Sequence, residues 1–287
     1  MNKLIKCIAL MSVFGFVFFG SYAFAKEDIT PYPPANWTPL EASYLIGHRV
    51  YDYGNRDLGT IDDLVIDQIH DRVALVILSD VPGFGAQQVA IPYGLLTRTG
   101  GGWFTINFPP DTELGYFEGE RSPYIHAFPG AEYDGTIDSS RVDSVYSSYG
   151  VAPYWKESAH DTGFQLFSYT DSLGAEAQFA QGGRAGRIYD LVLDHPDGRV
   201  NYALLSDIPG REDAMVAVPF SAFSRENDQM FVLNFGGDSL ASAPSFDESR
   251  DLRSRAYADG VYRHFGIQPY WTEGGMHEGD THHDDMY

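Results

Sequence analysis

The stretch Val73-Ala74-Leu75-Val76-Ile77-Leu78-Ser79-Asp80-Val81-Pro82-Gly83 joins an apolar run to a Pro-Gly turn. Its last five residues return as Ser206-Asp207-Ile208-Pro209-Gly210, at an offset of 127 (79 to 206). The same offset relates further pairs without a gap: Gly59 and Gly186, Asp63-Leu64-Val65 and Asp190-Leu191-Val192, Val89-Ala90-Ile91-Pro92 and Val216-Ala217-Val218-Pro219, and Asn107-Phe108 and Asn234-Phe235. A tail motif at residues 149–155 recurs at 265–271, at the shorter offset of 116 (155 to 271). The chain is therefore a tandem duplication of one domain-sized unit with its tail, and two copies are too few for a solenoid.

Short strands separated by turn residues are expected in the first copy, where helical periodicity is absent. The expected strands are residues 48–53, 59–67, 73–78, 88–91 and 103–108. Strands of this length at even spacing are typical of a small antiparallel barrel or sandwich. The predicted fold is mainly β, with two tandem small antiparallel β-barrels, each closed around aliphatic side chains and each followed by a short α-helix.

The apolar strand at 73–78 needs cover on both faces, because a strand with one wet face would alternate. One face would look into the barrel, and the tail element is the natural lid for the other. In that tail, residues 139–149 are expected to form a short helix that ends at Gly150 in the left-handed conformation. Residues 248–265 play the same part before Gly266. Each Pro-Tyr-Trp segment that follows is expected to pack its ring against a barrel.

The length of 287 residues agrees with two domains that each bury a core. The predicted order begins with a signal peptide at 1–25 and a Pro-rich lead-in at 26–42. The first barrel follows at 43–110 with its helix and Pro-Tyr-Trp tail element at 111–160, and the second barrel at 163–237 with its tail element at 238–273. A disordered tail rich in His and Asp is expected at 274–287.

Residues 1–25 have the pattern of a secretory signal peptide. Lys3 and Lys6 lead into an apolar run, and Ala23-Phe24-Ala25 is a small-x-small cleavage site. The alternative is a retained anchor helix, since the apolar stretch is only just short of the roughly 20 residues that span a bilayer. Cleavage after Ala25 predicts a periplasmic or secreted protein, and contact with a membrane would require the segment to be retained.

The mature chain is expected to be acidic and free of thiols. Cys7 is the only cysteine and lies in the signal segment, so the mature chain has no disulfide, thiolate metal site or cysteine nucleophile. The net charge of the whole chain is −21, and loss of Lys3 and Lys6 makes it −23. A polyanion of this size repels nucleic acid and anionic membranes. Basic, cationic or neutral partners are therefore expected, and nucleic acid is excluded.

The ordered pattern in each half resembles the PRC-barrel family. It is carried by Ile46-Gly47-His48-Arg49-Val50, residues 58–67 and 73–78, and Val89-Ala90-Ile91-Pro92, and in the second copy by Leu173-Gly174, residues 184–188 and 190–194, and Val216-Ala217-Val218-Pro219. That family includes the cytoplasmic domain of the photosynthetic reaction-centre H subunit and the C-terminal domain of a bacterial ribosome-maturation factor. The resemblance implies a small β-barrel that works by contact and has no catalytic residues. The tail helices lie outside the segments that carry the resemblance.

The predicted function is therefore an exported, non-catalytic module that binds another envelope protein or complex and carries no cofactor. The doubled loop is the first candidate for partner binding, through Asp80 and Pro82 and through Asp207 and Pro209, although Ser or Asp before Pro-Gly is also ordinary turn chemistry. Trp155 and Trp271 are further candidates, because each Pro-Tyr-Trp segment could form a groove for a partner's aromatic ring or proline. The remaining carboxylates on these strands are expected to point outward as solvated charges: Asp62, Asp63, Asp67, Asp190 and Asp194.

Two other functions stay open. The C-terminal tail contains His277, Asp280, His282 and His283, whose imidazole and carboxylate groups suit Zn²⁺, Cu²⁺ or Ni²⁺, against the alternative of a disordered polar tail. Gly237-Asp238-Ser239-Leu240 resembles the serine block of GDSL hydrolases, and the tail would supply its histidine. Against that interpretation, Ser239 lies late in the chain and directly follows a strand that the repeat already explains.

Overall fold

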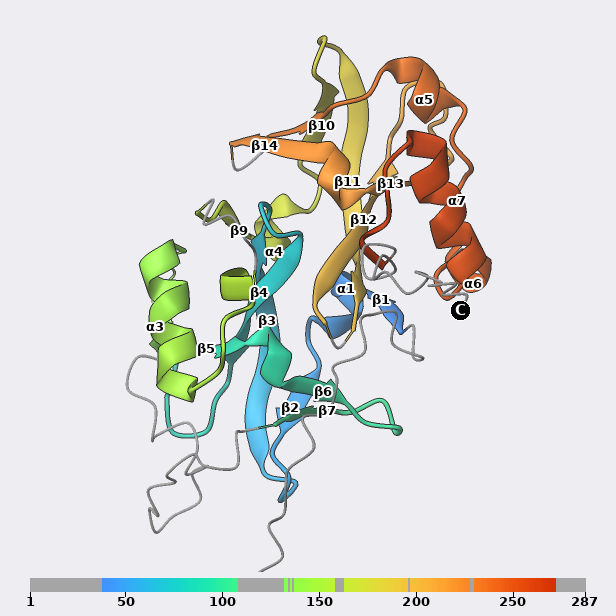
Figure 1. The fold of residues 1–287 in the computed structure, drawn as a ribbon. Helices are drawn as coiled ribbons and strands as arrows, with labels where there is room; N and C mark the ends of the chain where they lie inside the picture. The colour runs from blue at the N-terminus through green and yellow to red at the C-terminus, as the bar shows by residue number, and fades with distance from the viewer. Residues whose placement is uncertain are drawn as a thin grey trace, which may run out of the picture. The chain divides into compact units, whose positions relative to one another are not determined.

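The computed structural model describes residues 38–107, 132–133, 135, 137–157, 163–195, 197–227 and 230–271 (Figure 1). Each copy contributes a matching series of strands to one sheet. The first copy supplies β2 (Arg49–Tyr51), β3 (Asp57–Asp67), β4 (Arg72–Ser79), β5 (Gln88–Pro92), β6 (Leu96–Arg98) and β7 (Phe104–Ile106). The second supplies β10 (Glu176–Phe179), β11 (Arg184–Asp194), β12 (Arg199–Ser206), β13 (Val216–Pro219), β14 (Phe223–Asn227) and β15 (Met230–Leu233). Of the helices in this part of the chain, none is long and apolar enough to cross a membrane.

The prediction of two closed antiparallel barrels is wrong in two respects. β2 pairs with β7 in parallel, and β10 pairs with β15 in parallel. This follows from counting: β5 and β6 run in the same direction, so the chain reverses four times between β2 and β7. β7 therefore runs in the direction of β2, and pairing between the two must be parallel. In the described residues the sheet is also open, because its strand order ends at β14 and β6. β5, which continues through a 3₁₀ turn (η1, Tyr93–Leu95) into β6, lies off this order beside β4.

Both copies also contain a strand that the sequence did not suggest. β6 pairs with β7 as a hairpin, and β14 pairs with β15 in the same way. A 3₁₀ turn precedes each of them, η1 in the first copy and η3 (Phe220–Ala222) in the second. Beyond these hairpins, a short strand β8 (Glu132–Tyr133) pairs with the edge of β5.

The glycines that define the repeat stand where two strands approach closely. A Cβ atom on Gly59 in β3 would lie 2.5 Å from the backbone oxygen of Ser79, and one on Gly186 in β11 would lie 2.7 Å from the oxygen of Ser206. Gly59 also has φ +119°, a conformation that side chains with a Cβ avoid. The glycines are therefore repeated because the end of the facing strand occupies the space of a side chain.

The predicted lid over the apolar strand is confirmed. α3 (Ser139–Tyr149) begins at Asp138, whose side chain accepts from the backbone N of Arg141, and it ends at Gly150 with φ +64°. Its Tyr146 hydroxyl donates to the backbone oxygen of Ala74 at 3.1 Å, which places the helix on β4. Residues 73–78 are accordingly buried on both faces.

In the second copy the single helix expected at 248–265 is two helices. α6 (Glu248–Asp251) is followed by α7 (Arg255–Phe265) because the Ser254 side chain accepts from the backbone N of Tyr257 and starts a new helix. The Tyr262 hydroxyl donates to the backbone oxygen of Asn201 at 2.7 Å, at the repeat-related position on β12. α7 ends at Gly266 with φ +67°, as α3 ends at Gly150.

The two copies exchange their first elements. β1 (Pro39–Glu41) opens the first copy but pairs with β11 of the second, and α1 (Ala42–Leu45) follows it there. β9 (Leu166–Ser168) opens the second copy but pairs with β3 of the first, and α4 (Tyr169–Ser172) follows it. Figure 1 shows β1 and α1 in blue beside the yellow strands of the second copy.

A second junction, the seam, joins the two hairpin turns at residues 71–73 and 198–200. Arg72 of β4 pairs with Arg199 of β12, so the strands of both copies belong to one sheet. The backbone N of Val73 donates to Gly198 O and the backbone N of Val200 donates to Asp71 O, both at 2.8 Å. These two bonds are related by the repeat offset, so the seam has an approximate twofold relation.

Candidate functional site

The doubled loop has the same backbone in both copies. Asp80 and Asp207 have φ +52° and +51°, in the left-handed region that Asp tolerates better than most residues. The next residue, Val81 or Ile208, is buried and anchors the loop. Asp80, Asp207 and Pro209 are exposed and Pro82 is half-buried. The loop thus presents a carboxylate and a proline ring from a fixed backbone in each copy.

The electrostatic surroundings of the two loops differ. The Asp207 carboxylate lies 3.8 Å from both Arg184 and Arg187 in exposed ion pairs. These contacts are too long and too exposed to contribute much stability. The first copy places Asp57 and Thr60 at the positions of Arg184 and Arg187, so Asp80 has no repeat-related arginine beside it. The first loop therefore presents the less neutralised carboxylate.

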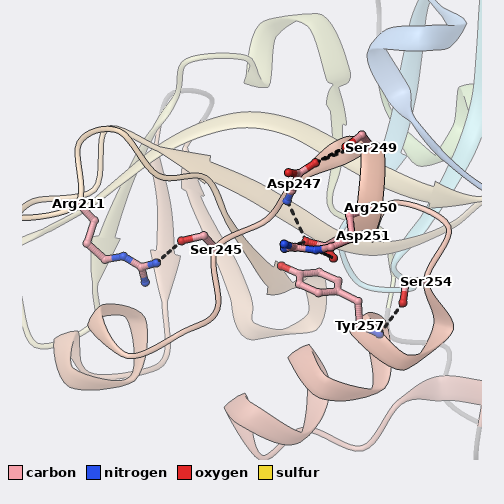
Figure 2. A network of polar contacts seen from close by, with 8 residues as sticks. All are labelled: Arg211, Ser245, Asp247, Ser249, Arg250, Asp251, Ser254 and Tyr257. Atoms are coloured by element: carbon pink, nitrogen blue, oxygen red, sulfur yellow. Dashed lines mark hydrogen bonds and ion pairs between the residues drawn. The ribbon is translucent and has the colours of Figure 1, made fainter.

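The second loop is tied to the tail element by Arg211, which follows Gly210 directly. Its guanidinium donates to the backbone oxygens of Leu240 at 3.0 Å and Ala243 at 2.7 Å, and to the hydroxyl of Ser245 at 2.7 Å. Figure 2 shows Arg211 directed at Ser245. Leu240 lies in the last turn of α5 (Gly237–Ala241), so Arg211 satisfies a carbonyl group that the helix leaves free.

Beyond Ser245 the tail is held by a second polar cluster, also drawn in Figure 2. Arg250 donates to both carboxylate oxygens of Asp251, at 2.7 and 2.6 Å, and the backbone N of Asp247 donates to the same carboxylate at 2.9 Å. The bonds from Arg250 lower the pKa of Asp251. Because this carboxylate is buried, the cluster fixes the turn that leads into α7.

The Pro-Tyr-Trp segments pack inward. Trp271 is only 4% exposed and its ring centroid lies 4.7 Å from that of Tyr262, while Trp155 is half-buried at 4.7 Å from Tyr146. The expected inward packing of these rings is confirmed, because Trp271 belongs to the hydrophobic core and Trp155 packs against it. As candidates for partner binding the two tryptophans remain a prediction, and Trp155 is the more accessible of them.

The tyrosine of each segment reaches a carboxylate buried at the end of a strand. Tyr154 donates to Asp67 and Tyr270 donates to Asp194, each at 2.9 Å. The neighbouring arginine of the seam lies over each tyrosine ring: Arg72 Cζ is 5.4 Å from the ring centroid of Tyr154, and Arg199 Cζ is 4.7 Å from that of Tyr270. The carboxylate, tyrosine and arginine form a constellation that occurs twice and fastens each tail to its copy.

The expectation that these strand carboxylates are solvated charges is wrong except for Asp62, which is exposed. Asp67, Asp190 and Asp194 are buried. Asp190 accepts from the backbone N of Ser43 at 3.2 Å and from the hydroxyl of Tyr169 at 2.6 Å, and half-buried Asp63 accepts from the backbone N of Thr170 at 3.0 Å. Asp63 and Asp190 point inward because each one binds the helix that the other copy has exchanged into its place.

Burial changes the titration of this group of acids. It raises the pKa of Asp194 to about 6 and that of Asp71, at the seam, to about 7. It also raises the pKa values of Asp63 and Asp190, although their hydrogen bonds act in the opposite direction. The physical cause is that a carboxylate loses hydration when it is covered by the exchanged elements and the tail.

His195, directly after β11, is a residue that the sequence did not single out. Its Nε2 accepts from the backbone N of Arg98 at 3.1 Å, and its Nδ1 lies 2.9 Å from the hydroxyl of Tyr93. Burial lowers the pKa of His195 to about 4, so the ring is neutral at pH 7. Its role is to join the second copy to β6 and η1 of the first, and no repeat-related histidine exists in the first copy to signal it.

Ser239, the centre of the alternative hydrolase interpretation, lies in α5. Its backbone oxygen, and not its hydroxyl, faces Nε2 of His264 at 2.8 Å. The helix holds five residues and is pinned by Arg211, so its geometry is that of a turn closing the tail. The histidines of the C-terminal tail, which that interpretation also needs, lie outside the described residues.

The metal candidates His277, Asp280, His282 and His283 lie outside the described residues as well, so metal binding by the tail stays a prediction. Within residues 38–271, as far as the structure describes them, no group of three or more His, Asp or Glu side chains is placed to hold a metal ion.

Comparison with known proteins places both copies in one family. The sequence model of the PRC-barrel domain matches residues 40–113 and 164–239. No curated protein matches the chain. The two matched segments cover the strands of each copy and together more than half of the chain, and they agree with the resemblance carried by the repeated glycines and apolar strands. The chain therefore belongs to the PRC-barrel domain family and contains two tandem copies of that domain.

Proposed function

We propose that this protein is exported and acts as a non-catalytic module that binds another protein, or helps to assemble a complex, in the cell envelope. Membership of the PRC-barrel domain family supports a module that works by contact. The signal-like pattern at residues 1–25 supports export, with cleavage after Ala25. The net charge of −21 favours a basic or neutral partner over nucleic acid.

The observation that carries the proposal is the doubled loop. In both copies an exposed aspartate in the left-handed conformation stands beside a proline, and a buried aliphatic residue fixes the loop to the core. Rigid loops that carry exposed polar groups on a scaffold are common binding elements. Binding by such a loop loses little conformational entropy, because its backbone is already ordered.

Site-specific crosslinking tests the binding role. A photoreactive amino acid replaces Pro82 or Pro209 in the full chain, and Tyr189, which is 53% exposed on β11 outside both loops, serves as the control position. We expect discrete adducts at the two loop positions in envelope extracts, suppressed by excess unlabelled wild-type protein. The same excess of an Asp80→Arg, Asp207→Arg double variant should suppress them less.

The proposal fails if the loop positions give only the diffuse adducts seen at Tyr189, or if the double variant competes as well as the wild type. The intact mass of the protein recovered from the envelope fraction tests export separately, since the mature chain should begin at Lys26. A mass that retains residues 1–25 would contradict cleavage without touching the loops.

A further inference from the structure

A shallow hollow lies on the first copy, at the parallel pair of β2 and β7. Its volume is about 430 Å³ and it is lined by Tyr51, Asn55, Thr99, Trp103 and Thr105. Tyr51 and Thr105 are register partners on the two strands. Thr99 and Trp103 close the β6–β7 hairpin, where the backbone N of Thr99 donates to Trp103 O at 2.8 Å. The hollow therefore lies where β2, β7 and the β6–β7 turn meet, separate from the doubled loops and their anchors.

Trp103 is held in an exposed position. Its side chain is 58% exposed, yet the ring lies against Tyr51 with centroids 5.3 Å apart. A Cβ atom on Gly101 would lie 2.9 Å from Cδ1 of this ring, so the glycine leaves room for the indole above the hairpin. An aromatic ring that is fixed and still open to solvent is ready to stack on a ligand without further ordering.

The second copy has the same backbone register and none of these side chains. Gln178 pairs with Val232 as Tyr51 pairs with Thr105. At the offset of 127, the five lining residues become Gln178, Gly182, Glu226, Met230 and Val232. The fold therefore does not require the aromatic hollow, because the sister copy forms the same sheet without it.

The lining is polar without being charged. Three arginines adjoin the lining along the chain. Arg49 and Arg56 are paired with the carboxylates of Asp57 and Asp52, and Arg98 donates to the Tyr44 hydroxyl at 3.3 Å and lies over the Tyr44 ring. The amide of Asn55 and the two threonine hydroxyls can both donate and accept hydrogen bonds. A ligand that fits must therefore be neutral, must present alternating donors and acceptors, and must have an apolar face for the indole.

We propose that the first copy binds a neutral saccharide in this hollow, with a sugar ring stacked on Trp103 and its hydroxyls bonded to Asn55, Thr99 or Thr105. Sugar rings combine an apolar C–H face with hydroxyls that donate and accept. The volume of about 430 Å³ lies in the range of small-molecule sites. A proline-rich peptide would share the aromatic stacking, but it needs a longer groove than five lining residues provide.

Saturation-transfer NMR on the full chain tests the proposal with four probes: cellotetraose, chitotetraose, maltotetraose and, as an acidic comparison, tetragalacturonate. We expect transfer to at least one neutral oligosaccharide and none to the acidic one. Trp103→Ala should weaken that binding about tenfold or more. Gly101→Ala should weaken it too, because its methyl group displaces the indole without removing it. Tyr189→Ala, which removes an exposed aromatic ring from the second copy, should leave binding unchanged.

Urea unfolding checks that the variants fold, since Trp103 is exposed and its loss should not move the midpoint. The proposal is overturned if no neutral oligosaccharide binds the folded wild type, or if Trp103→Ala and Tyr189→Ala weaken binding equally. Binding of a proline decapeptide that is lost in Trp103→Ala, without binding of any sugar, would also overturn it and assign the hollow to a peptide. Crosslinking at Pro82 and Pro209 is independent of every one of these results.

Discussion

Replacing Gly59 by alanine would put a methyl group 2.5 Å from the backbone oxygen of Ser79, a distance at which one strand has to shift. The residue also has φ +119°. Adopting that conformation with a Cβ costs about 1–2 kcal/mol, and forcing atoms into packed surroundings costs about 1–3 kcal/mol more. We expect Gly59→Ala to lower the free energy of unfolding by about 2–5 kcal/mol, a large part of the stability of an ordinary domain.

Gly186 supplies an internal comparison. A Cβ atom added there would lie 2.7 Å from Ser206 O, and the φ of +157° is close to the extended range, so both contributions are smaller. Gly186→Ala should therefore cost less than Gly59→Ala, about 1–3 kcal/mol. Gly94 is the control, because its Cβ would meet no heavy atom within 4 Å and the residue is exposed. Gly94→Ala should change stability by about 0.5 kcal/mol or less.

Equilibrium urea unfolding, followed by circular dichroism and by tryptophan fluorescence, measures all three variants under the same conditions. Both probes should report one transition, since the strands of the two copies form one sheet. If Gly59→Ala costs no more than Gly94→Ala, the close approach of β3 to Ser79 is not the reason for the repeated glycine. If Gly186→Ala costs more than Gly59→Ala, the ordering by distance and φ is wrong.

Three further predictions concern the buried groups and the exchange. Burial raises the pKa of Asp194 to about 6 and that of Asp71 to about 7, so the folded protein binds protons more tightly than the unfolded chain. The resulting stabilisation is complete below about pH 4 and is lost as the pH rises through these two pKa values. The urea midpoint should therefore fall between about pH 4 and pH 7, and it should fall less steeply in Asp194→Asn. Tyr270→Phe should cost about 1–3 kcal/mol in urea unfolding, and Tyr154→Phe less, because Asp67 keeps its 2.6 Å contact with His70 Nδ1. Cleavage at a protease site inserted between residues 157 and 163 should leave the halves associated in gel filtration without denaturant, because β1 and β9 hold them together; separation of the halves would contradict the exchange.

The sequence predicted the elements whose cause is local. The helix Ser139–Tyr149 and its end at Gly150 follow from a capping residue and a left-handed glycine, which act within a few residues. The cover over β4 followed from its unbroken apolar run. The parallel pairing of β2 and β7 could also have been deduced, since a sheet that returns to its first strand after five strands must end in a parallel pair.

The elements that were missed depend on contacts far apart in the chain. Residues 39–45 were expected to belong to the lead-in or to open the first copy, and nothing local indicates that they pair with β11. Nothing in the residues next to Asp63 and Asp190 indicates that they are covered, and only the exchanged helices explain it. The available signal for their burial was that Asp63 and Asp190 are related by the repeat offset. A solvent-exposed charge has no reason to be kept in both copies of a duplication.

The exchange gives a physical reason for the tandem arrangement. A single copy would leave the edge of β3 without β9, and its Asp63 carboxylate without the backbone N of Thr170. An unpaired strand edge is open to association with other chains, and a partly buried carboxylate without its donor is destabilising. Covalent linkage keeps the complementary β–α element at high effective concentration, so each copy completes the other within one molecule. The copies can differ wherever the exchange makes no demand on the side chains. The β2–β7 pair and its counterpart β10–β15 differ in this way: they keep the same register, but Trp103 stands in one copy and Met230 in the other.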